Sequence, residues 1–142
     1  MFRASAETSD PGAVPEWLNE GKASGVILLC LQSALVFGSN RRTPVRSRPV
    51  VLVKRDGNRL AVLPCTTHAP QRPGEFFELT ASRTFWIRPS KTALATRAFY
   101  RYEVVASGEI GKKIGTLTQN GRVDLMHWLQ ERHVTRPTHG QQ

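Results

Sequence analysis

Two apolar segments joined by a short polar turn restrict the fold of this chain more than any other feature. Residues 48–54 (RPVVLVK) and 59–65 (RLAVLPC) are rich in β-branched and aliphatic side chains, and residues 55–58 (RDGN) separate them. Such apolar runs favour strands, and an Asp-Gly pair between two of them is a strong signal for a tight turn. The sequence therefore predicts an antiparallel β-hairpin.

Short strands and one helix are expected around this hairpin. Further strands are predicted where apolar or aromatic residues cluster between turn residues, at 25–31, 75–79, 84–87 and 99–105. Residues 118–132 have apolar side chains at helical spacing, with Thr118 placed to cap the first turn. The candidate apolar faces are Val123, Met126 and Leu129, or Leu125, Trp128 and Leu129. This order predicts an α+β, mostly β domain, with a small curled, barrel-like sheet sealed by the helix.

One domain accounts for the length of the chain. The sequence has 142 residues, and no repeat or low-complexity linker divides its middle part. Residues 1–20 are rich in small and turn-forming residues without an apolar period, which predicts a flexible leader. Residues 135–142 are predicted to form a flexible tail, and a single domain is expected over residues 21–134.

The chain is strongly basic, with 20 Lys and Arg residues against 11 Asp and Glu residues and a net charge of +9. A field of this sign attracts polyanions, so RNA, DNA or an acidic protein would each suit the chain as a partner. A basic surface that merely aids solubility is the alternative. Charge alone does not decide between them.

Several features indicate a cytoplasmic protein without a metal or other cofactor. The apolar run 26–37 is too short to span a membrane and is interrupted by Gln32 and Ser33. The first twenty residues carry acidic side chains, unlike a secretory signal. Cys30 and Cys65 each lie in an apolar run, as buried thiols do in a reducing compartment, although the sequence does not exclude a disulfide. Cys and His residues show no metal-ligand spacing.

Polar residues stand at the outer ends of the predicted hairpin. Arg46 and Arg48 lead into the first strand, while Thr66, Thr67 and His68 follow the second. Because the ends of a tight antiparallel hairpin meet, these groups should lie within side-chain reach of one another at one rim of the sheet. A cation beside hydroxyl groups is a phosphate site in outline. Alternatively, the cation keeps a strand end solvated and the hydroxyls bond their own backbone.

With these features the sequence resembles the PemK/MazF family of endoribonuclease toxins. The segments RPVVLV, a turn and AVLPCTTH are similar to the family's central hairpin, and GVILLC, FFEL and a final IGTLT before an amphipathic helix follow the family's order. The resemblance covers about residues 25–132. It implies an SH3-like curled antiparallel barrel with a C-terminal helix. It also implies a homodimer that cleaves single-stranded RNA without a metal, leaving a 2′,3′-cyclic phosphate and a 5′-hydroxyl.

The resemblance further implies a catalytic pair. In the family this pair is the Arg of the RP dipeptide and the first Thr of the CTT segment, which correspond to Arg48 and Thr66. They would meet the negative charge that develops when the 2′-hydroxyl attacks the adjacent phosphate. His68 is our own addition as proton acceptor or donor near neutral pH, and Arg48 is the alternative acid. The loop before the hairpin departs from the family pattern, because it is Arg-rich where relatives often carry an acidic residue.

Five residues are candidates for RNA contact. Arg41, Arg42 and Arg46 either form a solvated basic loop or contact the RNA backbone. Thr67 stands beside the candidate catalytic Thr and either joins the site or only completes a strand end. Trp86 is the aromatic side chain expected to stack on an unpaired base, although aromatic residues in strands more often pack in the core.

The leading hypothesis is thus a sequence-selective, growth-inhibiting endoribonuclease toxin, held in check by an acidic antitoxin protein that covers its basic groove. A disordered acidic partner would suit the charge of the chain. The alternative is a catalytically inert SH3-like barrel that binds nucleic acid or a protein partner, because one fold hosts many functions.

Overall fold

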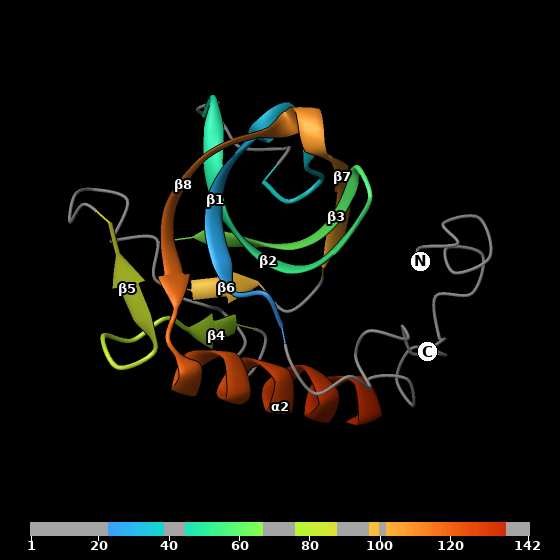
Figure 1. Ribbon diagram of the computed structural model, residues 1–142. Helices are drawn as coiled ribbons and strands as arrows, with labels where there is room; N and C mark the ends of the chain where they lie inside the picture. The colour runs from blue at the N-terminus through green and yellow to red at the C-terminus, as the bar shows by residue number, and fades with distance from the viewer. Residues whose placement is uncertain (1–22, 39–44, 67–75, 88–96, 100–101, 136–142) are drawn as a thin grey trace.

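The structure is a computed structural model that describes residues 23–38, 45–66, 76–87, 97–99 and 102–135. Within these residues an eight-stranded antiparallel sheet packs against one long helix (Figure 1). The elements are β1 (Val26–Leu31), β2 (Ser47–Asp56), β3 (Arg59–Thr66), β4 (Phe76–Glu78), β5 (Thr84–Trp86), β6 (Arg97–Phe99), β7 (Glu103–Ala106), β8 (Ile110–Leu117) and α2 (Gln119–Thr135), with 3₁₀ turns at Gln32–Ala34 and Ser107–Glu109.

The predicted class, α+β and mostly β with a C-terminal helix, is confirmed. The strand order is β4-β6-β3-β2-β1-β8-β5, with β7 pairing with β3. The sheet curls strongly, as Figure 1 shows for β1, β2, β3 and β8. Within the described residues the two end strands, β4 and β5, do not pair with each other, so the sheet is not closed into a barrel.

The predicted hairpin is formed by β2 and β3. Its register places Asp56 opposite Arg59, so the turn consists of Gly57 and Asn58. Gly57 has a φ of 64°, whereas Asn58 has a negative φ, because only glycines have a positive φ in the described chain. This combination is the pattern of a type II′ turn with Gly at its first central position. The Asp-Gly signal therefore located the turn correctly.

Both faces of this hairpin are buried, which explains its continuous apolar sequence. Alternate residues of β2 and β3 pack into two different clusters. Val51 and Leu63 face the core that packs against α2, whereas Val50 and Val62 join a second cluster that includes Leu35. Figure 1 shows the connection after β1 lying within the curl of the sheet. A strand buried on both faces reads as an unbroken apolar run.

The strand predicted over residues 99–105 is found only in part: residue 99 ends β6, residues 103–105 belong to β7, and residues 100–101 lie outside the described residues. The chain there forms two strands that pair with different parts of β3: β6 lies against Cys65 and Thr66, and β7 lies against residues 59–62. Between the two ladders the partner segment has two more residues than β3, since Val62 pairs with Glu103 and Cys65 with Ala98, so one regular strand cannot follow both parts. Strand β8 was not among the predicted strands, because residues 111–113 are exposed and break the apolar pattern.

Helix α2 closes the lower side of the sheet, beneath β4 and β6 in Figure 1. It begins after Thr118, whose Oγ1 accepts a hydrogen bond from the backbone N–H of Gly121 at 3.1 Å, so the predicted N-cap is confirmed. Leu125, Met126 and Leu129 are buried, and Trp128 is half-buried. Val123 is 40% exposed, so of the two apolar faces expected for the helix the second describes it better.

The two predicted terminal segments lie almost entirely outside the described residues. The predicted leader, residues 1–20, lies outside the described residues, as does the predicted tail apart from Thr135, where α2 ends. In the part of the chain that is described, no helix combines the length and apolar character needed to cross a membrane.

Candidate active site

Arg48 lies at the start of β2, at the rim where the two hairpin strands meet. Its Nη1 donates a hydrogen bond of 2.8 Å to the backbone carbonyl of Cys65, which directly precedes Thr66 in β3. Arg48 and Thr66 are each 5% exposed. The antiparallel hairpin therefore brings the Arg48 side chain to the Thr66 segment, as the sequence predicts.

Three groups among the described residues hold the guanidinium of Arg48 in a fixed orientation. Besides the Cys65 carbonyl, Gln32 Oε1 accepts a 2.6 Å hydrogen bond from Arg48 Nε. The ring of Phe37 lies beneath the guanidinium, with its centroid 4.9 Å from Cζ. A cation–π contact and two hydrogen bonds from one planar group leave it little rotational freedom.

Gln32 and Phe37 belong to the connection between β1 and β2, which a residue far along the chain holds in place. Glu103, at the start of β7, accepts hydrogen bonds from two successive backbone N–H groups: Val36 to Oε1 at 2.8 Å and Phe37 to Oε2 at 2.9 Å. Gln32 Nε2 donates to the carbonyl of Phe37, which closes the turn. Sequence reasoning noted Gln32 only as an interruption of an apolar run, and it missed Glu103.

A second cation lies on the strand next to Thr66. The register of β3 and β6 pairs Thr66 with Arg97, which is half-buried. Arg97 Nε donates to Glu78 Oε2 at 3.0 Å, an ion pair that joins β6 to β4. Sequence reasoning did not single out Arg97, because its pairing with Thr66 depends on how β6 docks against the end of β3.

The other candidate residues are placed as follows. Arg46 is exposed and stands two residues before Arg48. Arg41, Arg42, Thr67 and His68 lie outside the described residues, so their predicted roles stay predictions.

Trp86 is not brought to the rim. It is half-buried against the core and pairs with Gly115 of β8, whereas Cys30, the β1 partner of Arg48, pairs with Ile110 of β8. At about 3.3 Å per residue, the step from Ile110 to Gly115 carries Trp86 roughly 15 Å along the sheet from that rim. The exposed aromatic side chain of β5 is Phe85, which is 63% exposed.

Both cysteines are free and buried. Burial raises the pKa of the Cys65 thiol to about 12, against the opposing effects of the Arg48 charge and a hydrogen bond from the Val51 backbone. Burial also raises the pKa of Cys30 to about 11, and the charges of Glu109 and Glu103 add to this effect. Both groups are therefore thiols near neutral pH and are poor nucleophiles.

This burial predicts a specific thiol chemistry and pH dependence. At pH 8 iodoacetamide should react with folded Cys30 about a hundredfold, and with folded Cys65 about a thousandfold, more slowly than with the unfolded chain, because the thiolate fractions are smaller by about those factors. The folded pKa values lie above the ordinary 9.0, so the unfolded chain loses these protons first. The protonated thiols therefore make their full contribution to the free energy of unfolding below about pH 9. This contribution should fall by about 1.4 kcal/mol per pH unit for each thiol as pH rises towards 11.

Urea unfolding at pH 8 and pH 10 checks this dependence against a variant with alanine at both Cys30 and Cys65. The variant is expected to be less stable at pH 8 but to lose less stability between the two values. An equal loss in both proteins would contradict the assignment.

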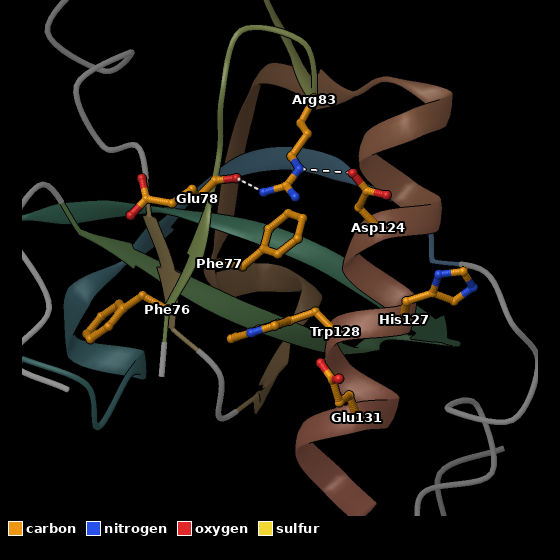
Figure 2. Close-up of a pocket in the computed structure, with 8 residues that line it drawn as sticks. All are labelled: Phe76, Phe77, Glu78, Arg83, Asp124, His127, Trp128 and Glu131. Atoms are coloured by element: carbon orange, nitrogen blue, oxygen red, sulfur yellow. Dashed lines mark hydrogen bonds and ion pairs between the residues drawn. The ribbon is translucent and has the colours of Figure 1, made fainter. Parts of the chain in front are cut away.

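A separate groove of about 440 Å³ lies between β4 and α2 (Figure 2). Three of its charged residues, Arg83, Asp124 and Glu78, form ion pairs within the chain. Arg83 donates to Asp124 Oδ2 at 3.1 Å and to the Glu78 carbonyl at 2.8 Å, and its guanidinium stacks on the Phe77 ring at 4.4 Å. Phe77 in turn packs against Trp128 at 5.5 Å between ring centroids. The contacts that line the groove thus hold the sheet against the helix.

Among the described residues, no group of three or more His, Cys, Asp or Glu side chains is arranged to hold a metal ion. A scan against protein-family models finds no match to this chain, and a search of curated proteins finds none either.

Proposed function

We propose that the protein is a metal-independent, sequence-selective endoribonuclease toxin of the PemK/MazF type, which cleaves single-stranded RNA. The observation that carries the proposal is the Arg48 guanidinium, fixed beside Thr66 at one rim of a curled sheet in a chain of net charge +9. A preorganised cation next to a hydroxyl group suits the stabilisation of a phosphorane.

In the proposed reaction the ribose 2′-oxygen forms a bond to the adjacent phosphorus, and the bond from phosphorus to the 5′-oxygen breaks. The 2′-hydroxyl proton passes to a base, and the leaving 5′-oxygen gains a proton. The products are a 2′,3′-cyclic phosphate and a 5′-hydroxyl. Arg48 offsets the extra charge on the phosphoryl oxygens and Thr66 donates a hydrogen bond to one of them. His68 is proposed to carry the proton.

Arg97 strengthens this proposal with a second positive charge. It lies opposite Thr66 on β6, so a phosphate at Thr66 would lie between two Arg-bearing strands. The ion pair with Glu78 orients the Arg97 side chain and offsets part of its charge.

The proposal includes the partners of a toxin. A homodimer is proposed as the active form in the cytoplasm, and an acidic, disordered antitoxin segment is proposed to cover the basic surface. Charge complementarity with a chain of net charge +9 supports such a partner through fast, salt-dependent association.

The direct test is to incubate the purified protein with a mixed-sequence single-stranded RNA in the presence of EDTA. Cleavage at a restricted set of sequences, with 2′,3′-cyclic phosphate and 5′-hydroxyl ends, is the expected result. RNA that stays intact while binding is measurable would reject the proposed activity.

That negative outcome would favour a second candidate, a catalytically inert SH3-like domain that binds nucleic acid or a protein partner. One observation favours it: Arg48 is 5% exposed, and its hydrogen bonds to Gln32 and to the Cys65 backbone resemble those of a structural cation. The EDTA assay separates the two functions, because only the first predicts cleavage.

Arg46→Ala should weaken RNA binding about equally for different sequences, since an exposed cation beside the rim contacts phosphate rather than bases. The slope of log affinity against log salt should become shallower by about 0.7. Arg59→Ala is the matched control, because Arg59 is also exposed but stands at the opposite end of the hairpin. Equal effects of the two substitutions in a salt titration would remove Arg46 from the binding surface.

A further inference from the structure

The orientation of Arg48 depends on a chain of contacts that starts at Glu103. The Glu103 carboxylate binds the backbone N–H groups of Val36 and Phe37 at 2.8 and 2.9 Å. This fixes the turn from which the Phe37 ring reaches the Arg48 guanidinium. The same turn orients Gln32, because Gln32 Nε2 donates to the Phe37 carbonyl while its Oε1 accepts from Arg48 Nε.

The sequence separation makes this contact unusual. Glu103 lies 67 residues from Val36, and strand β7 holds it by pairing Glu103 with Val62 of β3. The connection between β1 and β2 is therefore tied to the same strand whose end carries Cys65 and Thr66. The Glu103 carboxylate accepts hydrogen bonds from two successive N–H groups, which anchors the turn firmly because a charged acceptor bonds more strongly than a neutral one.

We propose that Glu103 is a positioning residue for the reaction, which sets the Arg48 guanidinium against Thr66 through the turn at Val36 and Phe37. This rests on the proposed function above. The Glu103 carboxylate bonds to the turn at Val36 and Phe37 and is proposed to act on the reaction only through Arg48. Its removal should therefore lower kcat while leaving the KM for RNA nearly unchanged, because displacement of a catalytic group by about 1 Å can cost a hundredfold in rate.

Three variants test this role. Glu103→Ala is expected to reduce kcat about 30-fold or more with less than about a threefold change in KM. Glu103→Gln keeps the size and one acceptor oxygen, so it should fall between Glu103→Ala and the wild type. Glu109→Ala is the matched control: the charge of Glu109 also acts on Cys30, but its carboxylate makes no hydrogen bond to the described part of the β1–β2 connection.

A readout independent of catalysis separates failure of this inference from failure of the proposed function. The Arg48 Nε–H proton, assigned in an NMR spectrum by its loss in Arg48→Lys, reports the bond to Gln32. Its solvent exchange should be at least about tenfold faster in Glu103→Ala than in Glu109→Ala. Unchanged exchange would overturn the positioning role. A wild-type protein that does not cleave RNA would overturn the proposed function, while the exchange rates would still decide whether Glu103 positions Arg48.

Discussion

Replacing Arg48 is expected to reduce RNA cleavage more than any other single substitution at the rim. Arg48→Ala should lower kcat by about 100- to 1000-fold, the usual effect of deleting one preorganised donor from a site that stabilises developing charge. Arg48→Lys keeps a positive charge but loses the planar fork that reaches both Gln32 and the Cys65 carbonyl, so it should restore only part of the rate. Toxicity on induced expression should fall in the same order.

A loss of folding must be separated from a loss of chemistry, because Arg48 is buried and bonded. Removing its side chain takes the Arg48 donors away from Gln32 Oε1 and the Cys65 carbonyl, and the loss of a donor costs roughly 1–3 kcal/mol where the acceptor is buried. Thr66→Val is the cleaner second variant, since it removes a hydroxyl at nearly constant volume. Cleavage rates are compared only for variants whose thermal unfolding shows that they are folded at the assay temperature. Folded Arg48→Lys and Thr66→Val proteins that cleave RNA at the wild-type rate would place the active site elsewhere.

The rim itself could be predicted because it depends on local sequence. Unbroken apolar runs on both sides of an Asp-Gly pair define one hairpin, and a hairpin brings its two outer ends together whatever the remaining chain does. This is why Arg48 is found at the Cys65 carbonyl, beside Thr66, as expected. The burial of both residues was less predictable, since it depends on how the sheet curls.

The groups that support Arg48 could not be predicted, because their contacts join segments far apart in the sequence. Glu103 was assigned to a strand that also contained residues 99–101, and nothing in that strand's pattern points to the turn at Val36. Arg97 could not be predicted for the same reason, since it lies opposite Thr66 only because β6 pairs with the last two residues of β3. Trp86 was placed near RNA by its aromatic character and by the cations Arg83 and Arg88 close to it in sequence, and the register of β5 against β8 takes it away from the rim.

Gly121 shows how such tertiary packing can reverse a local preference. By helix propensity alone, Gly121→Ala within α2 should stabilise the protein by about 1 kcal/mol. However, a Cβ at this position would collide with the backbone carbonyl of Arg83. That backbone is fixed, because the carbonyl of Arg83 accepts a 2.8 Å hydrogen bond from the N–H of Thr118 and the carbonyl of Ser82 accepts a 2.9 Å bond from the Thr118 hydroxyl.

We therefore expect Gly121→Ala to destabilise the protein by about 3 kcal/mol, as overpacking against an immobile neighbour does. For a domain of this size that corresponds to a melting temperature roughly 15 °C lower. Gly108→Ala is the matched control, because a Cβ at Gly108 meets no atom within 4 Å and the residue has no positive φ. Its effect should stay within about 0.5 kcal/mol. If Gly121→Ala instead melts higher than the wild type, helix propensity dominates at this position and the start of α2 is not clamped by the turn at Ser82 and Arg83.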